Sequence, residues 1–315
     1  MGAIDLAVRG ATHPDLTRAR SRARQARRSK WIALGFLAPN LLGVTIFTVI
    51  PLIAGVLVAF TKWNVVSGLG GIRWVGLDNF VQLLHDPVFG WALFRTVVFM
   101  LATVPLIVLI GLALATVLNK PIPGRSALRA IFFLPYVVNV VAIGTVWLIL
   151  FNPDYGLINR LLSIIGFSNG PGWLISTEWA LPGLMIITVW SGVGFASVIY
   201  LAAMQDLPGD LYEAAQLDGA SAWGRFRAIT WPALRPTTTF LVITTMISVS
   251  QGFALIAYLT QGGPGDSTTT ISYYMYQTGF QFFKFGYASA VGMVMFLIVL
   301  VLTVLSWRAQ RGDVV

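Results

Sequence analysis

The 315-residue chain contains no cysteine, which excludes disulfides, thiolate chemistry and cysteine-ligated metals. It has two histidines, His13 and His85, which are far apart in the sequence and lie outside the long apolar stretches. We interpret both as loop residues rather than metal ligands, so no metal site is expected. The sequence also lacks a G-x-x-x-x-G-K-[ST] phosphate loop and therefore carries no P-loop ATPase site of its own.

Charged residues are scarce as well. They make up 10% of the chain, against about 25% in soluble domains. Hydrophobic residues make up 57%, more than a single soluble core could hide from water. Six long stretches contain no charge at all: residues 31–61, 96–119, 130–153, 179–205, 236–265 and 285–307. Each exceeds the about 20 residues that a helix needs to cross a hydrocarbon core of ~30 Å. The sequence therefore predicts an all-α polytopic membrane protein with six transmembrane helices.

The 21 Lys and Arg residues are unevenly distributed between the segments that join these stretches. Seven lie just before the first stretch: Arg18, Arg20, Arg22, Arg24, Arg27, Arg28 and Lys30. An arginine-rich arm can bind RNA, but a basic block that abuts a membrane helix is usually a topology signal, so no nucleic acid partner is expected. With a cytoplasmic N-terminus, the inner segments hold 16 basic residues and the outer segments five. We therefore expect both termini in the cytoplasm and an uncleaved first span.

This topology divides the chain into three parts. Residues 1–30 form a basic cytoplasmic segment, residues 31–308 a six-helix transmembrane domain, and residues 309–315 a cytoplasmic tail. The uncharged, tyrosine-rich segment 267–283 is predicted to form an interfacial helix after the turn at residues 262–265.

Four prolines are expected to break or kink the first three apolar stretches: Pro39, Pro51, Pro105 and Pro135. Lipid tolerates such breaks only where neighbouring helices or a cavity satisfy the freed backbone groups. Proline is, however, generally commoner in membrane helices than in soluble ones. We favour a bundle with a pathway over a plain anchor.

The long inner loop, residues 206–235, contains the clearest local signals. Pro208 suits a first helical turn, and Gly219 can end that helix in a left-handed conformation. Ser221 can cap a second helix, which Pro232 is expected to stop. All acidic residues of the loop precede Gly219, and all basic residues follow it. The loop is therefore predicted to form a helix–turn–helix at the inner membrane surface, with a negatively charged half that a partner can approach closely.

This loop resembles the EAA loop of ABC importer permeases, in which it forms a coupling helix that docks into a cleft on the ATPase subunit. The matching residues are Glu213, Ala214, Ala215, Gly219, Phe226, Ile229 and Pro232. Segments 74–80 (WVGLDNF), 152–162 (NPDYGLINRLL) and 259–270 (LTQGGPGDSTTT) resemble the sugar-type, maltose-like permeases, so the resemblance covers nearly the whole chain. Trp231 departs from the family, which usually has leucine before the proline, and we expect this apolar replacement to be tolerated.

The resemblance implies a transmembrane permease subunit, in the cell inner membrane, of an ATP-driven importer for a sugar or a related neutral polyol. The implied partners are a second, homologous permease subunit in a heterodimer, two ATPase subunits and an extracytoplasmic solute-binding protein. The chain is then not an enzyme and holds no cofactor, because ATP and magnesium bind to the ATPase subunits. An ion-coupled secondary transporter of a small polar solute is the alternative. A membrane-embedded enzyme is a third class, but the stretches hold no His–Asp, Ser–Lys or paired-carboxylate constellation.

The apolar stretches also bear on the solute. None of them contains Asp, Glu, Lys, Arg or His, the groups that ion-coupled carriers usually need and that a strongly anionic solute would favour. The remaining aromatic, hydroxyl and amide side chains suit a neutral polyhydroxylated ligand. The resemblance implies sugar contacts at Trp190, Gly192, Phe195, Thr245, Ser248 and Gln251, for each of which helix packing is the alternative role. The paired asparagines of the maltose type are absent there, which argues against maltose itself.

Overall fold

The computed structural model describes residues 35–167 and 170–311, so the basic segment 1–30 lies outside the described residues. The chain separates into two compact units, Met1–Leu57 and Val58–Val315, and each is described by itself. Both described parts are predominantly helical, as the sequence predicts.

The described part of the first unit belongs to one apolar helical run, Gly35–Ala59. A π-helical turn, η1 (Thr45–Val49), leads in this run into α2 (Ile50–Ala59). The helix continues through Pro39 and Pro51, so neither proline breaks this stretch, and the kink that was expected as the other outcome stays a prediction.

The second unit begins with short elements and continues as helices. The short elements are β1 (Thr61–Lys62), η2 (Val65–Ser67), η3 (Leu69–Gly71), β2 (Arg73–Trp74) and α3 (Asp78–His85). The next helices are α4 (Pro87–Leu118), α5 (Arg125–Val137), α6 (Val140–Leu150), α7 (Leu157–Ile164), α8 (Ala180–Gln205) and α9 (Gly209–Leu217). The chain then forms α10 (Ala222–Arg225), η4 (Phe226–Thr230), α11 (Trp231–Ser250), α12 (Phe253–Leu259), α13 (Ile271–Tyr276), η5 (Gln277–Gln281) and α14 (Phe285–Arg311).

Four helices of the described chain are long and apolar enough to cross a membrane: Gly35–Ala59, Pro87–Leu118, Ala180–Gln205 and Phe285–Arg308. Two bent pairs are further candidates. They are α5 with α6, bent by 101°, and Ala222–Ser250 with α12, bent by 41°. The structure thus supports four to six spans, and the predicted six require that each bent pair counts as one.

The bend between α5 and α6 lies at Asn139. The side-chain Oδ1 of Asn139 accepts a hydrogen bond from the backbone N–H of Val141 at 2.8 Å and so caps α6. The preceding Val138 is extended, with ψ 143°. Pro135 lies inside α5, so the predicted break is present but falls after the proline. Pro105 does not end α4 either.

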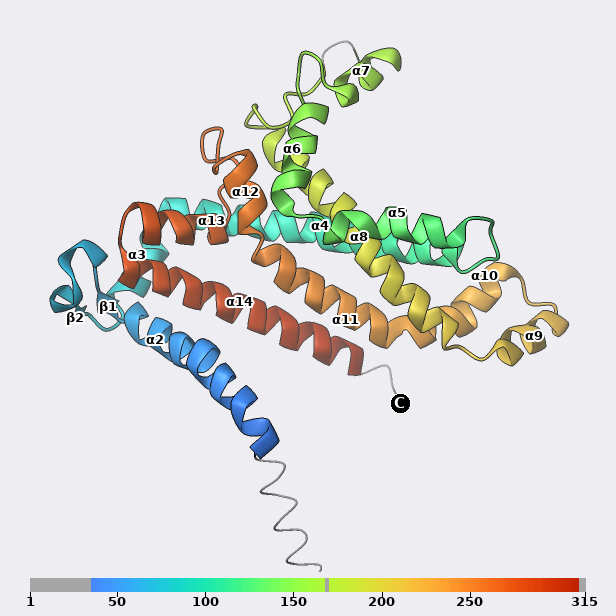
Figure 1. The fold of residues 1–315 in the computed structure, drawn as a ribbon, viewed down its shortest axis with the longest axis horizontal. Coiled ribbons are helices and arrows are strands. Elements are labelled where there is room, and N and C mark those ends of the chain that lie inside the picture. The colour runs from blue at the N-terminus through green and yellow to red at the C-terminus, as the bar shows by residue number, and fades with distance from the viewer. Residues whose placement is uncertain (1–34, 168–169, 312–315) are drawn as a thin grey trace, which may run out of the picture. The chain divides into compact units, whose positions relative to one another are not determined.

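In the second unit, α4, α8, α11 and α14 lie alongside one another, with α9 and α10 beyond one end and α3 and α13 at the other (Figure 1). Tyr200, Leu234 and Leu241 are fully buried in the core between α4, α8 and α11. A Cβ added to Gly111 of α4 would lie 2.6 Å from the Cβ of Ala196 in α8. Small residues therefore set the close spacing of these two helices.

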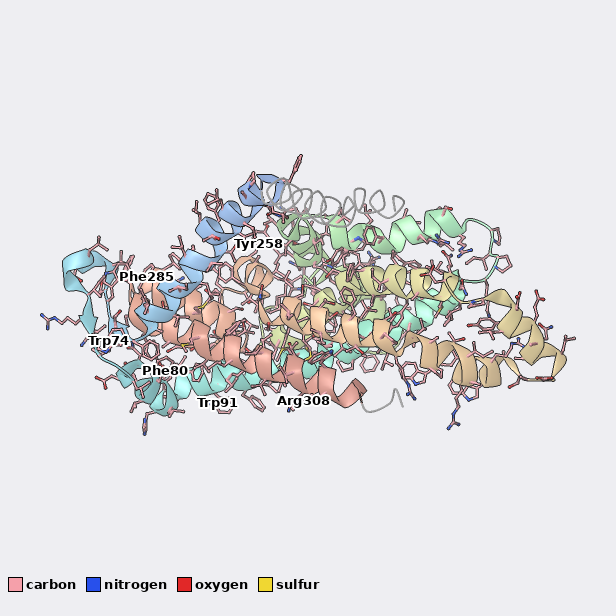
Figure 2. All side chains as sticks on the ribbon, turned by 90° about the horizontal axis from the view of Figure 1, so that it is seen from below. Trp74, Phe80, Trp91, Tyr258, Phe285 and Arg308 are labelled. Carbon is pink, nitrogen blue, oxygen red and sulfur yellow. The ribbon has the colours of Figure 1, made fainter. Side chains whose placement is uncertain are left out.

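The β-hairpin is fixed to α3 by aromatic and amide contacts. Phe60 stacks on Trp74 with ring centroids 5.7 Å apart and contacts Phe80 at 5.3 Å (Figure 2). The side-chain amide of Asn79 donates to the backbone carbonyls of Ala59 and Thr61 at 2.8 and 2.9 Å. These contacts give the WVGLDNF segment a structural role.

The tyrosine-rich segment after the turn at residues 262–265 forms α13 and η5, which confirms that it is helical. The hydroxyls of Tyr274 and Tyr287 donate to Oδ2 of Asp86 at 2.5 Å. Oδ1 of the same carboxylate accepts from the backbone N–H groups of Val88 and Phe89 and caps α4. Asp86 therefore joins α4 to both α13 and α14.

We expect Asp86→Asn to lower stability in a pH-dependent way. Burial raises the pKa of Asp86, but hydrogen bonds from the two tyrosines and from the backbone outweigh it, so the pKa lies below the ordinary 3.8. The ionised group thus contributes stability that is present above about pH 4 and lost as the pH falls through the lowered pKa. Loss of hydrogen bonds to a charged group should cost about 2 kcal/mol at pH 7. Thermal unfolding checks this, and equal stability of variant and wild type at pH 7 would contradict it.

Candidate functional site

The loop after α8 folds as a helix, a tight turn and a second helix. Pro208 is the N-cap residue of α9, so it lies one position before the first helical turn, where it was predicted. Gly219 has φ +75°, left-handed as predicted, and a Cβ there would meet no atom within 4 Å. Backbone conformation, not space, therefore favours glycine. Oγ of Ser221 accepts from the backbone N–H of Gly224 at 3.1 Å and caps α10, as predicted.

The prediction that Pro232 stops the second helix is wrong. The helix runs without interruption from Ala222 to Ser250 through α10, η4 and α11. Pro232 lies two residues beyond the π-helical turn η4, and Pro51 lies two residues beyond η1. A π-helical turn is wider than an α-helical one and displaces the carbonyl that the proline ring would otherwise meet. The second helix of the loop therefore leads directly into α11.

The surface of α9 is exposed, and no residue of this helix is buried. Glu213 lies on it, and the helix contains no basic residue. Leu217 is 90% exposed, and Trp223, which is 70% exposed, stacks on Phe226 at 5.4 Å. The other residues of the predicted coupling set lie close by in the sequence: Ala214 is exposed, and Ala215 and Ile229 are partly buried. Exposed apolar side chains beside the two acids of α9, Asp210 and Glu213, are typical of a protein contact.

One hydrogen bond connects α9 to the second helix, and another holds the turn between them. The hydroxyls of Tyr212 in α9 and Thr230 in η4 are 2.8 Å apart. Nη1 of Arg225 donates to the backbone carbonyl of Ala220 at 2.9 Å and holds the turn. Because η4 continues into α11, a displacement of α9 would reach α11.

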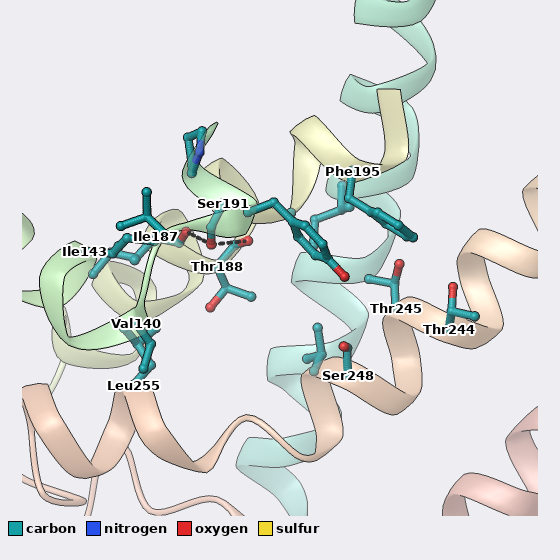
Figure 3. Close-up of a pocket in the computed structure, with 16 residues that line it drawn as sticks. Val140, Ile143, Ile187, Thr188, Ser191, Phe195, Thr244, Thr245, Ser248 and Leu255 are labelled. Carbon is teal, nitrogen blue, oxygen red and sulfur yellow. Dashed lines mark hydrogen bonds between the residues drawn. The ribbon is translucent and has the colours of Figure 1, made fainter. Parts of the chain in front are cut away.

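A cavity of about 450 Å³ lies between α4, α5, α6, α8, α11 and α12 (Figure 3). The 101° bend between α5 and α6 shapes one side of it. Tyr136 and Phe195 stack at 4.7 Å with their ring planes 18° apart and form an aromatic wall. The lining residues are Ile107, Pro135, Tyr136, Val138, Val140, Ile143, Ile187, Thr188, Ser191, Gly192, Phe195, Thr244, Thr245, Ser248, Val249 and Leu255.

Hydroxyl groups form the polar part of this cavity. Ser191, Thr188 and Thr244 each donate to a carbonyl of their own helix at 2.7 to 2.8 Å, so their lone pairs remain as acceptors. Thr245 and Ser248 project from α11 (Figure 3). None of the described residues that line the cavity is Asp, Glu, Lys, Arg or His. Such a lining offers stacking and neutral hydrogen bonds but no group for acid–base or metal chemistry.

The structure brings together four of the six residues that were predicted to contact solute: Gly192, Phe195, Thr245 and Ser248. Trp190 does not line this cavity. It lies on another face of α8 and packs edge-on against Trp147 at 5.5 Å. Gln251 is also outside it, because it follows α11 at the break before α12 and lines a different hollow.

Two lining residues, Tyr136 and Thr188, were missed from the sequence. Tyr136 follows Pro135 and lies three residues before Asn139, which caps α6. Both are polar residues within an apolar stretch, and this was the sequence signal that could have pointed to Tyr136. Thr188 lies one helical turn before Gly192 and Ser191 and so on the same face of α8.

Comparison with known proteins agrees with this geometry. Residues 89–311 match the family described as binding-protein-dependent transport system inner membrane component. The lactose transport system permease protein LacF of Rhizobium radiobacter is 36% identical over 282 residues, which cover 88% of this chain and 93% of the relative. The probable starch degradation products transport system permease protein AmyD of Thermoanaerobacterium thermosulfurigenes is 33% identical over 280 residues, which cover 89% and 94%.

Solved structures share the fold over most of the chain. A chain from the crystal structure of a bacterial ABC transporter involved in the import of the acidic polysaccharide alginate has a TM-score of 0.81 at 27% identity. The match covers 93% of this chain and 100% of that one. A bacterial alginate ABC transporter in complex with an alginate pentasaccharide-bound periplasmic protein gives 0.80 at 26% identity, covering 91% and 96%.

Proposed function

The chain belongs to the family of binding-protein-dependent transport system inner membrane components, and we propose that it is a permease subunit of an ATP-driven importer for a neutral sugar or polyol. The observation that carries the solute assignment is the cavity, which combines a stacked aromatic pair with hydroxyls and has no charged residue among those described in its lining. Aromatic faces and neutral hydrogen bonds suit polyhydroxylated ligands. The similar alginate transporter imports an acidic polysaccharide, so the uncharged lining, rather than that likeness, favours a neutral solute.

The proposed complex contains a second, homologous permease, two ATPase subunits that bind ATP and magnesium, and an extracytoplasmic solute-binding protein. The exposed surface of α9 supports the ATPase contact, because no element of the described chain covers Glu213 or Leu217. The alginate transporter that was solved with a periplasmic protein supports a partner of that kind. The chain itself would be non-catalytic.

The proposed topology has six spans with both termini in the cytoplasm. It rests on the distribution of basic residues and on counting each bent pair as one span. Since the chain lacks cysteine, single cysteines at Arg160 and Arg227, both exposed, can be labelled without background. Only the cysteine at 160 should react from outside intact cells, and the reverse would refute the orientation.

Uptake into proteoliposomes tests the proposed function. The complete complex should accumulate a labelled neutral disaccharide only with ATP inside and the binding protein outside. The ion-coupled secondary transporter is the other candidate, and solute flux by this chain without any ATPase subunit would establish it. A panel of disaccharides and polyols presented to the binding protein identifies the solute class.

We expect Phe195→Ala to raise the solute concentration that half-saturates transport by about tenfold. The substitution removes an aromatic contact with the solute and the stacking partner of Tyr136, and together these are worth about 1.4 kcal/mol, which is a tenfold change. Trp190→Ala is the matched control, because it deletes a larger ring from the same helix outside the cavity. Solute-stimulated ATPase activity of the assembled complex is the measurement. A larger effect of Trp190→Ala than of Phe195→Ala would contradict the assignment.

A further inference from the structure

Helix α8 separates two hollows that lie on opposite faces of it. Ser191 and Phe195 line the cavity described above, whereas Ile186, Val189 and Trp190 line a groove of about 540 Å³. The other walls of this groove come from α4 and α5, and its lining is almost entirely apolar. The groove therefore lies on the side of α8 that is turned away from the cavity.

At one end the groove meets another hollow of about 570 Å³. Ala102 and Met185 line both, so the two hollows adjoin each other along α4 and α8, and together they are called the channel below. The second hollow lies at the N-terminal ends of α4 and α8, far along α8 from the loop at 206–235. Here the lining is still largely apolar but also includes Arg95, Thr177, Glu178 and Ser267.

The polar end has the chemistry of a membrane–water interface. Arg95 lies over Trp91, with its guanidinium carbon 5.7 Å from the ring centroid. Trp91 is 59% exposed (Figure 2), and tryptophan is characteristic of the level of lipid headgroups. Hydrogen bonds from its own backbone N–H and from the Thr177 hydroxyl hold the pKa of Glu178 below its usual 4.5, so this carboxylate is ionised at neutral pH. One fixed cation and one fixed anion thus line the same opening.

We infer that this channel binds a phospholipid with a zwitterionic headgroup that carries a primary ammonium. The phosphate lies at Arg95, the ammonium lies at Glu178, and an acyl chain fills the groove between α4, α5 and α8. Arg95 and Ile110 mark the two ends of the channel on α4 and are about 22 Å apart at 1.5 Å per residue. One leaflet of the hydrocarbon core is about 15 Å thick, so the channel is long enough for an acyl chain.

Photolabelling of the complete complex tests this assignment. The probe is phosphatidylethanolamine with a diazirine in the middle of its acyl chain, in nanodiscs of unlabelled phosphatidylethanolamine and phosphatidylglycerol. Wild type should be labelled preferentially within residues 102–110 and 185–194. Arg95→Gln should reduce that labelling at least threefold, while Lys284→Gln, which removes an exposed cation elsewhere, should leave it unchanged. ATPase co-purification verifies that each variant assembles.

Two further labelling experiments test the headgroup assignment and the groove assignment separately. A phosphatidylglycerol probe lacks the ammonium and should label at least threefold less, and equal labelling by both probes would refute the headgroup assignment. Ala102→Phe narrows the junction of the two hollows and should reduce labelling near Ile110 without changing Arg95. Uniform labelling of all lipid-facing helices, insensitive to Arg95→Gln, would overturn the site. So would a cysteine at Leu106 that crosslinks to the partner permease, because the groove would then hold a protein helix.

Discussion

Replacing Gly219 with valine is expected to leave the chain inserted in the membrane but to reduce solute-stimulated ATP hydrolysis to the basal rate. Gly219 has φ +75°, a conformation that costs an L-residue about 1–2 kcal/mol and a β-branched residue more. Valine would relieve this strain by rotating the backbone, which turns α10 relative to α9. The hydrogen bond between Tyr212 and Thr230 depends on that arrangement. The exposed surface of α9 would then no longer move together with α11.

The matched control is Gly219→Asn, because asparagine tolerates the left-handed region far better than valine does. A Cβ at this position meets no atom of the described chain within 4 Å, so crowding at the Cβ does not distinguish the two substitutions. Asparagine should therefore retain most of the coupling while valine loses it. Wild-type ATP hydrolysis and transport in the valine variant would refute the role of the turn. Equal loss in both variants would indicate that a partner side chain packs directly on Gly219.

The turn at Gly219 could be predicted from the sequence because its signals are local. Glycine supplies the left-handed residue and Ser221 supplies the cap, and neither depends on distant parts of the fold. Pro232 was misjudged for the opposite reason. A proline signals a helix end, but the π-helical turn η4 before it lets the helix continue, and that turn has no comparable local signal.

The cavity was predictable only in part. Gly192, Phe195, Thr245 and Ser248 were assigned to the right helices and face one another in the structure. Trp190 was assigned to the same face although a helix rotates by about 100° per residue, so positions 190 and 192 point in very different directions. Which face of α8 borders the cavity depends on how α8 packs against α4 and α5. These tertiary contacts cannot be read from the sequence of α8.

The bend at Asn139 shows how average hydropathy hides a local signal. Residues 130–153 form an apolar stretch without charge, and a break or kink was expected only at Pro135. The side chain of Asn139 instead caps a new helix, and the chain turns by 101°. Whether α5 and α6 count as one span thus depends on a turn that one polar residue caps.

Glu213→Gln is expected to weaken binding of the ATPase subunit to this chain by about 30-fold. Glu213 is exposed on α9, which contains no basic residue, so a cation on the partner is its natural counter-charge. Removing one member of a charge pair that docking desolvates costs about 2 kcal/mol or more, and each 1.4 kcal/mol is a tenfold change. Asp210→Asn is the matched control. It neutralises another exposed acid of the same helix, where the expected loss is limited to the interaction with the helix dipole, about 0.3–1 kcal/mol.

Co-purification of the ATPase with each permease variant, titrated against salt, is the measurement. The Glu213→Gln variant should bind the ATPase subunit more weakly, and its binding should depend less on salt concentration. The reason is that the interaction it loses is electrostatic. Insertion and amount of the permease should stay normal, since Glu213 contributes nothing to a buried core. Restoration of binding by an acidic residue at the partner's cation, combined with Glu213→Lys, would identify the pair. Equal weakening by Asp210→Asn would show that the helix responds to net charge alone, and wild-type retention in Glu213→Gln would remove α9 as the coupling element.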